Sequence, residues 1–237
     1  AFPFLNTYRN RSYFLDFLPK NINIISQHSL PRAFYNIVLM WIFGYGSLVW
    51  KIDFKFECKL VGYIKGYSRR FYQHSTDHRG IPEKPGRVVT VIGCDDVNSR
   101  VWGVAYKIAK EDVEQVTKDL DFREKNGYIK RTVTFYPTDD HKPFELTLYV
   151  ATEDNISYAV PWGPRIAKQV VCCQGPSGPN KEYVYNLASA MRQLAPDCED
   201  EHLFALEAAV METASENIFL EKKPVSRDYI INQCMYS

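Results

Sequence analysis

The sequence predicts an α+β fold, in which a curved sheet or small mixed β-barrel is flanked by helices. Short segments rich in β-branched and aromatic residues, bounded by glycine and proline, predominate between residues 41 and 150. Segments with apolar residues at helical spacing follow from residue 180 onwards. Strands grouped ahead of helices, without internal repeats or low-complexity tracts, are typical of one α+β domain.

Most of the first half of the chain has the composition of β-strands. The segments expected to be strands or strand-like are 41–43, 48–50, 59–66, 87–93, 101–108 and 144–150. In the last of them apolar and more polar residues alternate, which indicates a half-buried strand because successive side chains point to opposite faces. The segment 65–73, KGYSRRFYQ, mixes bases with aromatics. Arg69 and Arg70 stand where an RNA-binding strand needs an aromatic and an aliphatic residue, so an ordinary amphipathic strand is favoured.

Three segments are expected to be helices: 110–126, 180–194 and 199–217. Each carries apolar residues three or four positions apart, which places them on one face of a helix. The residues expected to point inward are Val113, Val116, Leu120, Tyr183, Leu187, Met191, Leu194, Leu203, Leu206 and Val210.

Residues 1–39 differ from the rest of the chain. They carry four basic residues against one acid, and their apolar residues show no regular period. Basic, acid-poor segments are typical of presequences, and a disordered or non-native leader explains the same pattern. We expect an N-terminal extension over 1–39, one domain over 40–220 and a C-terminal tail over 221–237.

The overall composition argues against several classes of protein. A net charge of +1 predicts no bulk attraction to nucleic acid or to a membrane surface, and no run of 18 apolar residues is present. The six cysteines form no CxxC pair, so neither a zinc site nor a disulfide framework is indicated. Reduced thiols in a cytoplasmic protein are expected.

The helix expected over 110–126 has a carboxylate at the end of its apolar face. Position 124 lies four residues beyond Leu120 and returns to the same face, because an α-helix has about 3.6 residues per turn. That residue is Glu124, and Gly127 then ends the helix. Burial raises the pKa of a carboxylate, so Glu124 beside a cavity is a candidate general base and acid. An ion pair with a neighbouring base such as Arg131, or exposure at the helix end, is the alternative.

The segment from Gly44 to Leu48 places two glycines inside an apolar run. Ser47 follows both glycines, whereas the nucleophile elbow needs serine between them, so the segment is not that motif. Glycines permit a positive φ and a close approach of backbone to a ligand. Successive amides in such a loop can bind an anion. The loop is a candidate site for a carboxylate or carbonyl oxygen, with a plain turn as the alternative.

The segment from His74 to His78 contains two histidines and an acid. A His-x3-His pair binds metal on a helix, where both side chains share a face. Glycines and prolines follow closely and indicate a loop, so no metal site is predicted. Arg79, on the same loop, can clamp a carboxylate with two parallel hydrogen bonds, or can be an ordinary surface arginine.

Nine segments together resemble the ChaC-type γ-glutamylcyclotransferases, most closely the shorter, glutathione-specific subgroup. The resemblance extends from Met40 to about Val210. In chain order the segments are FGYGSLVW (43–50), VGYIKGYSRRFYQ (61–73), STDHRG (75–80), PGRVVT (85–90), VWGVAY (101–106), LDFREKNGY (120–128), TFYP (134–137), GPSG (175–178) and DEHLFALE (200–207).

This resemblance implies a γ-glutamylcyclotransferase-like fold and the cleavage of glutathione to 5-oxoproline and cysteinylglycine, without a metal or other cofactor. The family's catalytic glutamate corresponds to Glu124. The substrate-binding residues that the resemblance implies are Tyr45, Gly46, Ser47, Leu48, Arg79 and Tyr183. The expected partner is glutathione, bound by a monomer. Two stretches depart from the family pattern, at His74 and at 158–167.

The implied reaction is an attack of the γ-glutamyl α-amine on its own side-chain amide, with Glu124 moving the proton. Two other functions remain open: a cyclotransferase acting on other γ-glutamyl amines or amino acids, and a non-catalytic module that binds γ-glutamyl peptides. The presence of Glu124 favours catalysis, because a module that only binds an anionic peptide gains nothing from a buried negative charge.

Overall fold

The computed structural model describes residues 40–123, 128–159 and 163–221. They belong to one compact unit, Ile37–Ser237. The expected extension over 1–39 and the tail from residue 222 lie outside the described residues, so both domain boundaries stay predictions. None of the helices in the described ranges is both long enough and apolar enough to cross a membrane.

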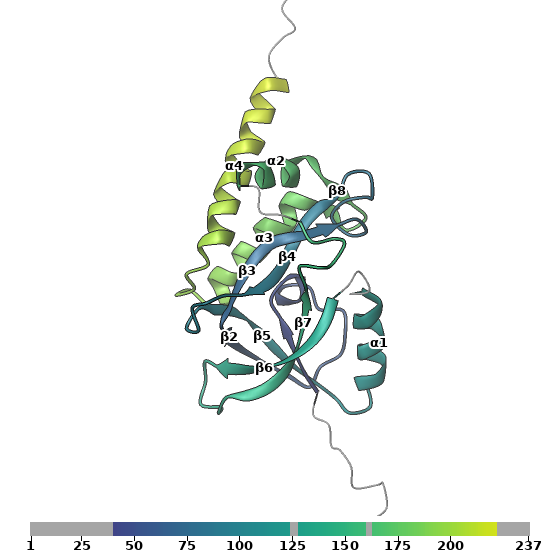
Figure 1. The fold of residues 1–237 in the computed structure, drawn as a ribbon, viewed down its shortest axis with the longest axis vertical. Coiled ribbons are helices and arrows are strands. Elements are labelled where there is room, and N and C mark those ends of the chain that lie inside the picture. The colour runs from purple at the N-terminus through teal and green to yellow at the C-terminus, as the bar shows by residue number, and fades with distance from the viewer. Residues whose placement is uncertain (1–39, 124–127, 160–162, 222–237) are drawn as a thin grey trace, which may run out of the picture. The chain divides into compact units, whose positions relative to one another are not determined.

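Five strands close into a small barrel in the order β1-β5-β2-β6-β7 (Figure 1). They are β1 (Met40–Gly44), β2 (Cys58–Lys65), β5 (Arg100–Ile108), β6 (Tyr128–Pro137) and β7 (Phe144–Ala151). Adjacent strands are antiparallel except β1 and β7, which pair in parallel at Ile42 and Thr147. The predicted small mixed barrel is therefore confirmed.

The remaining elements lie around the barrel. A two-stranded ribbon consists of β3 (Tyr67–Ser75) and β4 (Gly86–Gly93), and a short hairpin consists of β8 (Gln174–Gly175) and β9 (Gly178–Pro179). The helices are α1 (Val113–Arg123), α2 (Gly163–Cys172), α3 (Asn180–Leu194), α4 (Glu201–Glu221) and the short 3-10 helix η2 (Ser47–Val49). In Figure 1, α2, α3 and α4 gather beside β3 and β4, whereas α1 lies beside the barrel.

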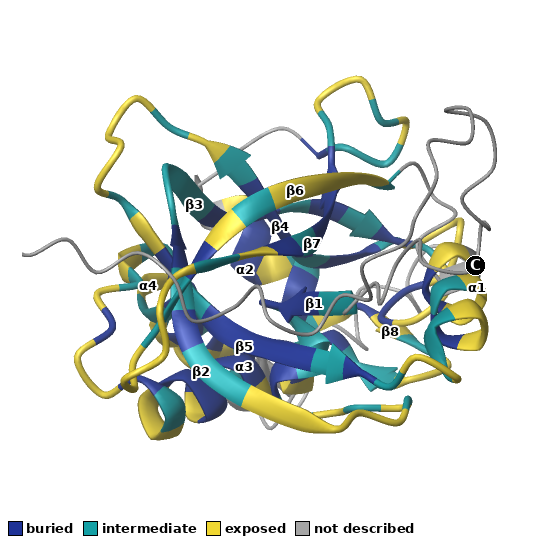
Figure 2. Cartoon of the chain, turned by 90° about the horizontal axis from the view of Figure 1, so that it is seen from below, coloured by how far each residue is buried: buried dark blue, intermediate teal, exposed yellow. Residues whose placement is uncertain are grey.

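The barrel and the helices share one hydrophobic core. Figure 2 shows the buried residues concentrated along β1, β4 and β5, with exposed residues on the connecting loops. The side chains expected to point inward from the helices are buried, apart from Val113 and Leu194, which are partly buried. Apolar burial at about 25 cal/mol per Å² drives this arrangement, because each helix hides one apolar stripe against the sheet.

The structure corrects two local expectations. Residues 48–50 do not form a strand, because Val49 N donates to Gly46 O (3.0 Å) and Trp50 N donates to Ser47 O (3.1 Å), and these two hydrogen bonds close a 3-10 turn. A short apolar run does not by itself distinguish a strand from a buried turn. His74 is not in a loop, because it pairs with Arg87 in the β3–β4 ribbon.

Candidate active site

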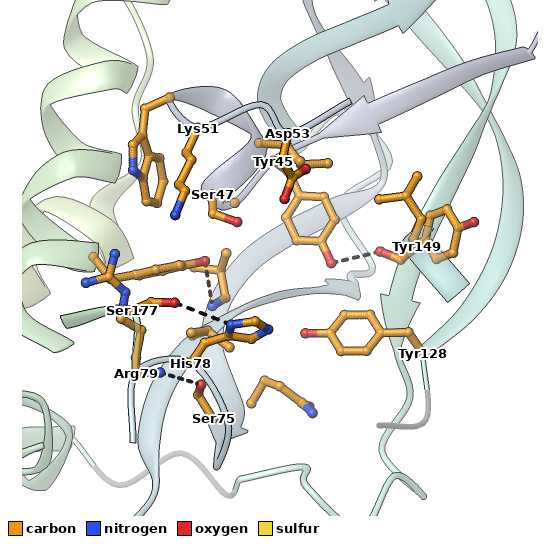
Figure 3. A pocket seen from close by; sticks show the side chains of 18 of the residues that line it. Tyr45, Ser47, Lys51, Asp53, Ser75, His78, Arg79, Tyr128, Tyr149 and Ser177 are labelled. Carbon is orange, nitrogen blue, oxygen red and sulfur yellow. Dashed lines mark hydrogen bonds between the residues drawn. The ribbon is translucent and has the colours of Figure 1, made fainter. Parts of the chain in front are cut away.

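A cavity of about 320 Å³ lies beside the loop that connects β1 to η2 (Figure 3). All six residues predicted to bind substrate line this one cavity, although they come from three separate segments of the chain. They are Tyr45, Gly46, Ser47, Leu48, Arg79 and Tyr183. The loop after β1, the segment after β3 and the first turn of α3 supply them.

Glu124, the predicted general base, lies outside the described residues. The described residues nearest to it along the chain that line the cavity are Leu120, on α1, and Tyr128, at the start of β6. The elements that precede and follow position 124 in the sequence, α1 and β6, therefore each contribute a residue to the cavity wall. The placement and role of Glu124 stay a prediction.

The glycines of the loop permit close packing. Gly46 has φ −118°, so it does not use the positive φ that a glycine permits. A Cβ atom built on Gly46 would lie 2.9 Å from the Tyr183 hydroxyl and 3.0 Å from a methyl of Val89. One built on Gly44 would lie 2.8 Å from the Cβ of Leu48. The absence of a side chain at Gly46 therefore lets the loop lie close to α3 and β4, and the absence of one at Gly44 leaves room for Leu48.

Tyr45 fastens the loop to the barrel. Its buried hydroxyl donates a 2.8 Å hydrogen bond to the carbonyl oxygen of Tyr149 on β7. The Tyr149 hydroxyl in turn donates to Asp121 on α1 (2.9 Å), and Lys130 pairs with the same carboxylate. The hydrogen bond from Lys130 lowers the pKa of Asp121, so this carboxylate stays ionised at neutral pH. These contacts join the loop, β7 and α1 into one wall of the cavity.

Tyr183 lines the cavity from α3. Its ring packs edge-on against Trp50 and Phe71, with centroid distances of 5.2 and 6.0 Å. Its hydroxyl accepts a long hydrogen bond from Val89 N (3.4 Å). These two ring contacts and the hydrogen bond from Val89 N fix the position of the Tyr183 side chain.

Arg79 is a buried cation, with 8% of its surface exposed. Its Nη1 donates to the carbonyl of Pro179 (3.0 Å) and lies 3.6 Å from a carboxylate oxygen of Glu182. Its backbone amide donates to the Ser75 hydroxyl (3.0 Å). Nη2 forms no hydrogen bond with any residue in the described ranges and remains able to bind a carboxylate.

The GPSG motif holds the Arg79 segment in place. Ser177 N donates to the carbonyl of His78 (2.9 Å). A Cβ atom on Gly175 would lie 2.4 Å from that same carbonyl, so this close contact requires glycine. Gly178 adopts φ 101°, in the region that favours glycine, and turns the chain from β8 into β9. Two motifs about a hundred residues apart therefore pack as one unit.

Sequence reasoning missed several residues of the cavity wall. Those with polar side chains that were not considered individually are Lys51, Asp53, Gln73, Ser75, Tyr128, Tyr149 and Ser177. They are dispersed over five segments with no common spacing, and although Gln73, Ser75, Tyr128 and Ser177 lie in segments that carry the family resemblance, no pattern assigned them a role. Lys51 and Asp53 lie within three residues of the end of the FGYGSLVW segment, and this position was the signal that could have drawn attention to these two residues.

The two histidines considered as metal ligands have different neighbours. The His74 ring lies 3.4 Å from Gln169, and burial together with the nearby charge of Arg87 lowers its pKa. The His78 ring lies 3.4 Å from the Ser177 hydroxyl. In the described ranges no three His, Cys, Asp or Glu residues form a group that could hold a metal ion.

Comparisons with a family model and with known proteins indicate the same family. The family model described as ChaC-like protein matches residues 40–213. Glutathione-specific gamma-glutamylcyclotransferase 1 of Danio rerio is 48% identical over 178 residues, which cover 73% of this chain and 90% of that protein. The Homo sapiens protein of the same name is 46% identical over 184 residues, covering 76% and 82%.

A solved structure agrees with these sequence relatives. The crystal structure of the yeast γ-glutamyl cyclotransferase specific to glutathione superimposes with a TM-score of 0.69 at 29% identity. The match covers 73% of this chain and 96% of the yeast chain. The barrel, the ribbon and the helices described above are therefore those of this structural family.

Proposed function

Because the chain belongs to the ChaC-like protein family, we propose that it is a glutathione-specific γ-glutamylcyclotransferase, a lyase that cleaves glutathione to 5-oxoproline and cysteinylglycine. One observation carries this proposal beyond family membership. The YGSL loop, Arg79 and Tyr183, which the family motifs single out, line one cavity of about 320 Å³. That volume lies in the range of pockets that enclose small ligands, roughly 300–1,000 Å³.

The reaction is an intramolecular aminolysis. The α-amine of the glutamyl residue forms a bond to its own side-chain carbonyl carbon, and the bond from that carbon to the cysteine nitrogen breaks. The new ring has five members, so the reacting atoms are already tethered. The protein needs only to hold the bent conformer, and well-oriented intramolecular reactions reach effective molarities of about 10⁵ M or more.

Proton transfer is assigned to Glu124. At neutral pH the α-amine is mostly protonated and cannot attack, so a base must remove a proton first. The departing cysteine nitrogen then needs a proton, and the same carboxyl group can return it. The family motif and the sequence position between Leu120 and Tyr128, which both line the cavity, support this role.

Substrate binding is assigned to the loop and to Arg79. Backbone amides of residues 45–48 are proposed to hold the glutamyl carboxylate or the oxyanion that develops on the carbonyl. The guanidinium of Arg79 is proposed to bind one of the two carboxylates of glutathione. The hydroxyl of Tyr183 adds a further polar group on the α3 side of the cavity.

The cellular setting is also a proposal. We place the enzyme in the cytoplasm as a monomer. Five cysteines in the described ranges are free thiols, which fits a reducing compartment. They are Cys58, Cys94, Cys172, Cys173 and Cys198.

The test is to incubate the purified protein with glutathione and to quantify both products. We expect 5-oxoproline and cysteinylglycine in equal amounts. γ-Glutamylcysteine and γ-glutamylalanine are assayed in parallel. Equal kcat/KM for all three would replace glutathione specificity with a broader γ-glutamyl activity. Binding of glutathione without formation of either product would indicate a non-catalytic binding module instead of an enzyme.

A further inference from the structure

Lys51 is a cation of the cavity wall whose charge the described residues leave uncompensated. It lies two residues after the end of η2, and its backbone amide donates to Ser47 O (2.8 Å), which anchors the residue beside the loop. The side chain is exposed and lines the cavity. Its ammonium forms no hydrogen bond or ion pair with any residue of the described ranges.

The second cation of the cavity, Arg79, is in a different situation. It is buried, and Pro179 and Glu182 hold its Nη1. In Figure 3 the Lys51 side chain extends from the loop into the cavity, toward the side where Arg79 and Ser177 lie. The cavity therefore offers one rigid, enclosed cation and one mobile cation close to solvent.

Glutathione has two carboxylates, and the reaction places different requirements on how each one is bound. The glutamyl carboxylate adjoins the reacting amine, so it must be held still and away from water for the ring to close. The glycine carboxylate lies at the other end of the tripeptide and leaves with the product. A buried, fixed guanidinium suits the first, and an exposed, flexible ammonium suits the second.

We infer that Lys51 binds the glycine carboxylate of glutathione and thereby selects the tripeptide over shorter γ-glutamyl compounds. This inference rests on the proposed function. Asp53 and Asp77 also line the cavity, so the site is not uniformly positive. Lys51 and Arg79 attract carboxylates whereas Asp53 and Asp77 repel them, which gives the bound peptide a direction.

The inference predicts a particular kinetic signature. The glycine carboxylate does not change during ring closure, so its contact with Lys51 stabilises the ground state and the transition state equally. Losing such a contact raises KM and leaves kcat nearly unchanged. For an exposed charged hydrogen bond we expect an effect of about tenfold.

The experiment compares glutathione with its glycine monoethyl ester, which lacks only the charge at the far end. In the wild type we expect kcat/KM to favour glutathione about tenfold. In Lys51→Met this preference falls to about one, through KM, and Lys51→Arg keeps most of it. Lys55→Met, which removes an exposed lysine four residues further on, serves as the matched control and retains the wild-type preference.

Each outcome decides the question. A wild type without a preference for glutathione over the ester, or a Lys51→Met variant that keeps the full preference, overturns the inference while the cyclotransferase activity stands. A Lys51→Met variant that loses kcat equally on both substrates also overturns it, because Lys51 then acts on the chemistry or the fold. A wild type that releases no 5-oxoproline from either substrate removes the proposed function, and the inference with it.

Discussion

The hydroxyl of Tyr183 lies 2.9 Å from the point that a Cβ atom on Gly46 would occupy. The two residues come from separate elements that line the cavity, the loop after β1 and the first turn of α3. The missing side chain at Gly46 allows these two elements to come this close together.

Gly46→Ala should therefore push the loop and Tyr183 apart. Overpacking of this kind costs about 1–3 kcal/mol of unfolding free energy, and displaced substrate contacts should lower kcat/KM by about 10–100-fold. Steady-state kinetics and thermal unfolding measure the two effects.

Two further variants show whether the contact with the hydroxyl is responsible. Gly46→Ala combined with Tyr183→Phe removes the oxygen in conflict, so the double variant should lose less stability than the sum of the single changes. Gly93→Ala is the control, because a Cβ atom there has no neighbour within 4 Å. Strict additivity in the double variant would mean that the loop is displaced for another reason.

Glu124→Gln should abolish turnover while leaving the fold intact. The amide keeps the shape of the side chain but cannot accept the proton of the substrate amine, so kcat should fall by about 10²–10⁴-fold. The melting temperature should change little. Glu111→Gln, near the start of α1 in the same region of the chain, should behave like the wild type. A folded Glu124→Gln protein with near-normal turnover would remove this residue from the mechanism.

Arg79→Met should weaken recognition of the glutamyl carboxylate. A glutathione analogue with that carboxylate amidated tests this directly, because the wild type should prefer the natural substrate by about 10–100-fold. Arg79→Met should lose most of that preference, and Arg79→Lys should recover only part, because an ammonium cannot form two parallel hydrogen bonds. If the variant keeps the preference and loses only thermal stability, Arg79 is structural, acting through Pro179 and Glu182.

The stability of the fold should depend on pH through His202. Phe71 N donates to its Nε2 (3.1 Å), and burial, followed by the nearby charge of Arg70, lowers its pKa to about 4. In the unfolded chain the pKa is near its ordinary value of about 6.5. Between these two values the unfolded state binds more protons, so the stabilising effect is complete above about pH 6.5 and is lost as the pH falls toward 4.

Thermal unfolding across this pH range measures the effect. The melting temperature of the wild type should fall more steeply below pH 6.5 than that of His202→Gln, whose amide oxygen can accept the same hydrogen bond without titrating. Parallel curves for the two proteins would assign the acid sensitivity to other groups.

Much of the fold could be predicted because its elements have strong local signals. The three predicted helices correspond to α1, α3 and α4 within a few residues at each end, and the predicted range of α3 coincides with the observed one. The strand segments correspond to β1, β2, β3, β4, β5 and β7. Periodic apolar residues mark these elements, since each buries one face. The 3-10 turn at Ser47–Val49 was missed because the apolar run 48–50 is too short to show the periodicity of a helix or of a strand.

The candidate site was predicted only where motifs named its residues. Tyr45, Arg79 and Tyr183 were identified by resemblance, and the structure places them around one cavity. Lys51 had no signal of its own, because a lysine after an apolar run is ordinary on any protein surface. Its significance comes from its position in the cavity and from its lack of a partner among the described residues.

By itself, then, the sequence determined the class of fold, the main elements and the family, because these follow from local periodicity and from motifs along the chain. The reason for the glycines was decided only by tertiary structure. Gly46 has an ordinary negative φ, and what it requires is space for Tyr183, a residue 137 positions away in the chain (183 − 46). The same holds for the charges of the cavity. Whether the side chain of Arg79 or Lys51 forms an ion pair or a hydrogen bond depends on residues that folding brings next to it. The spacing of residues along the sequence does not predict these neighbours.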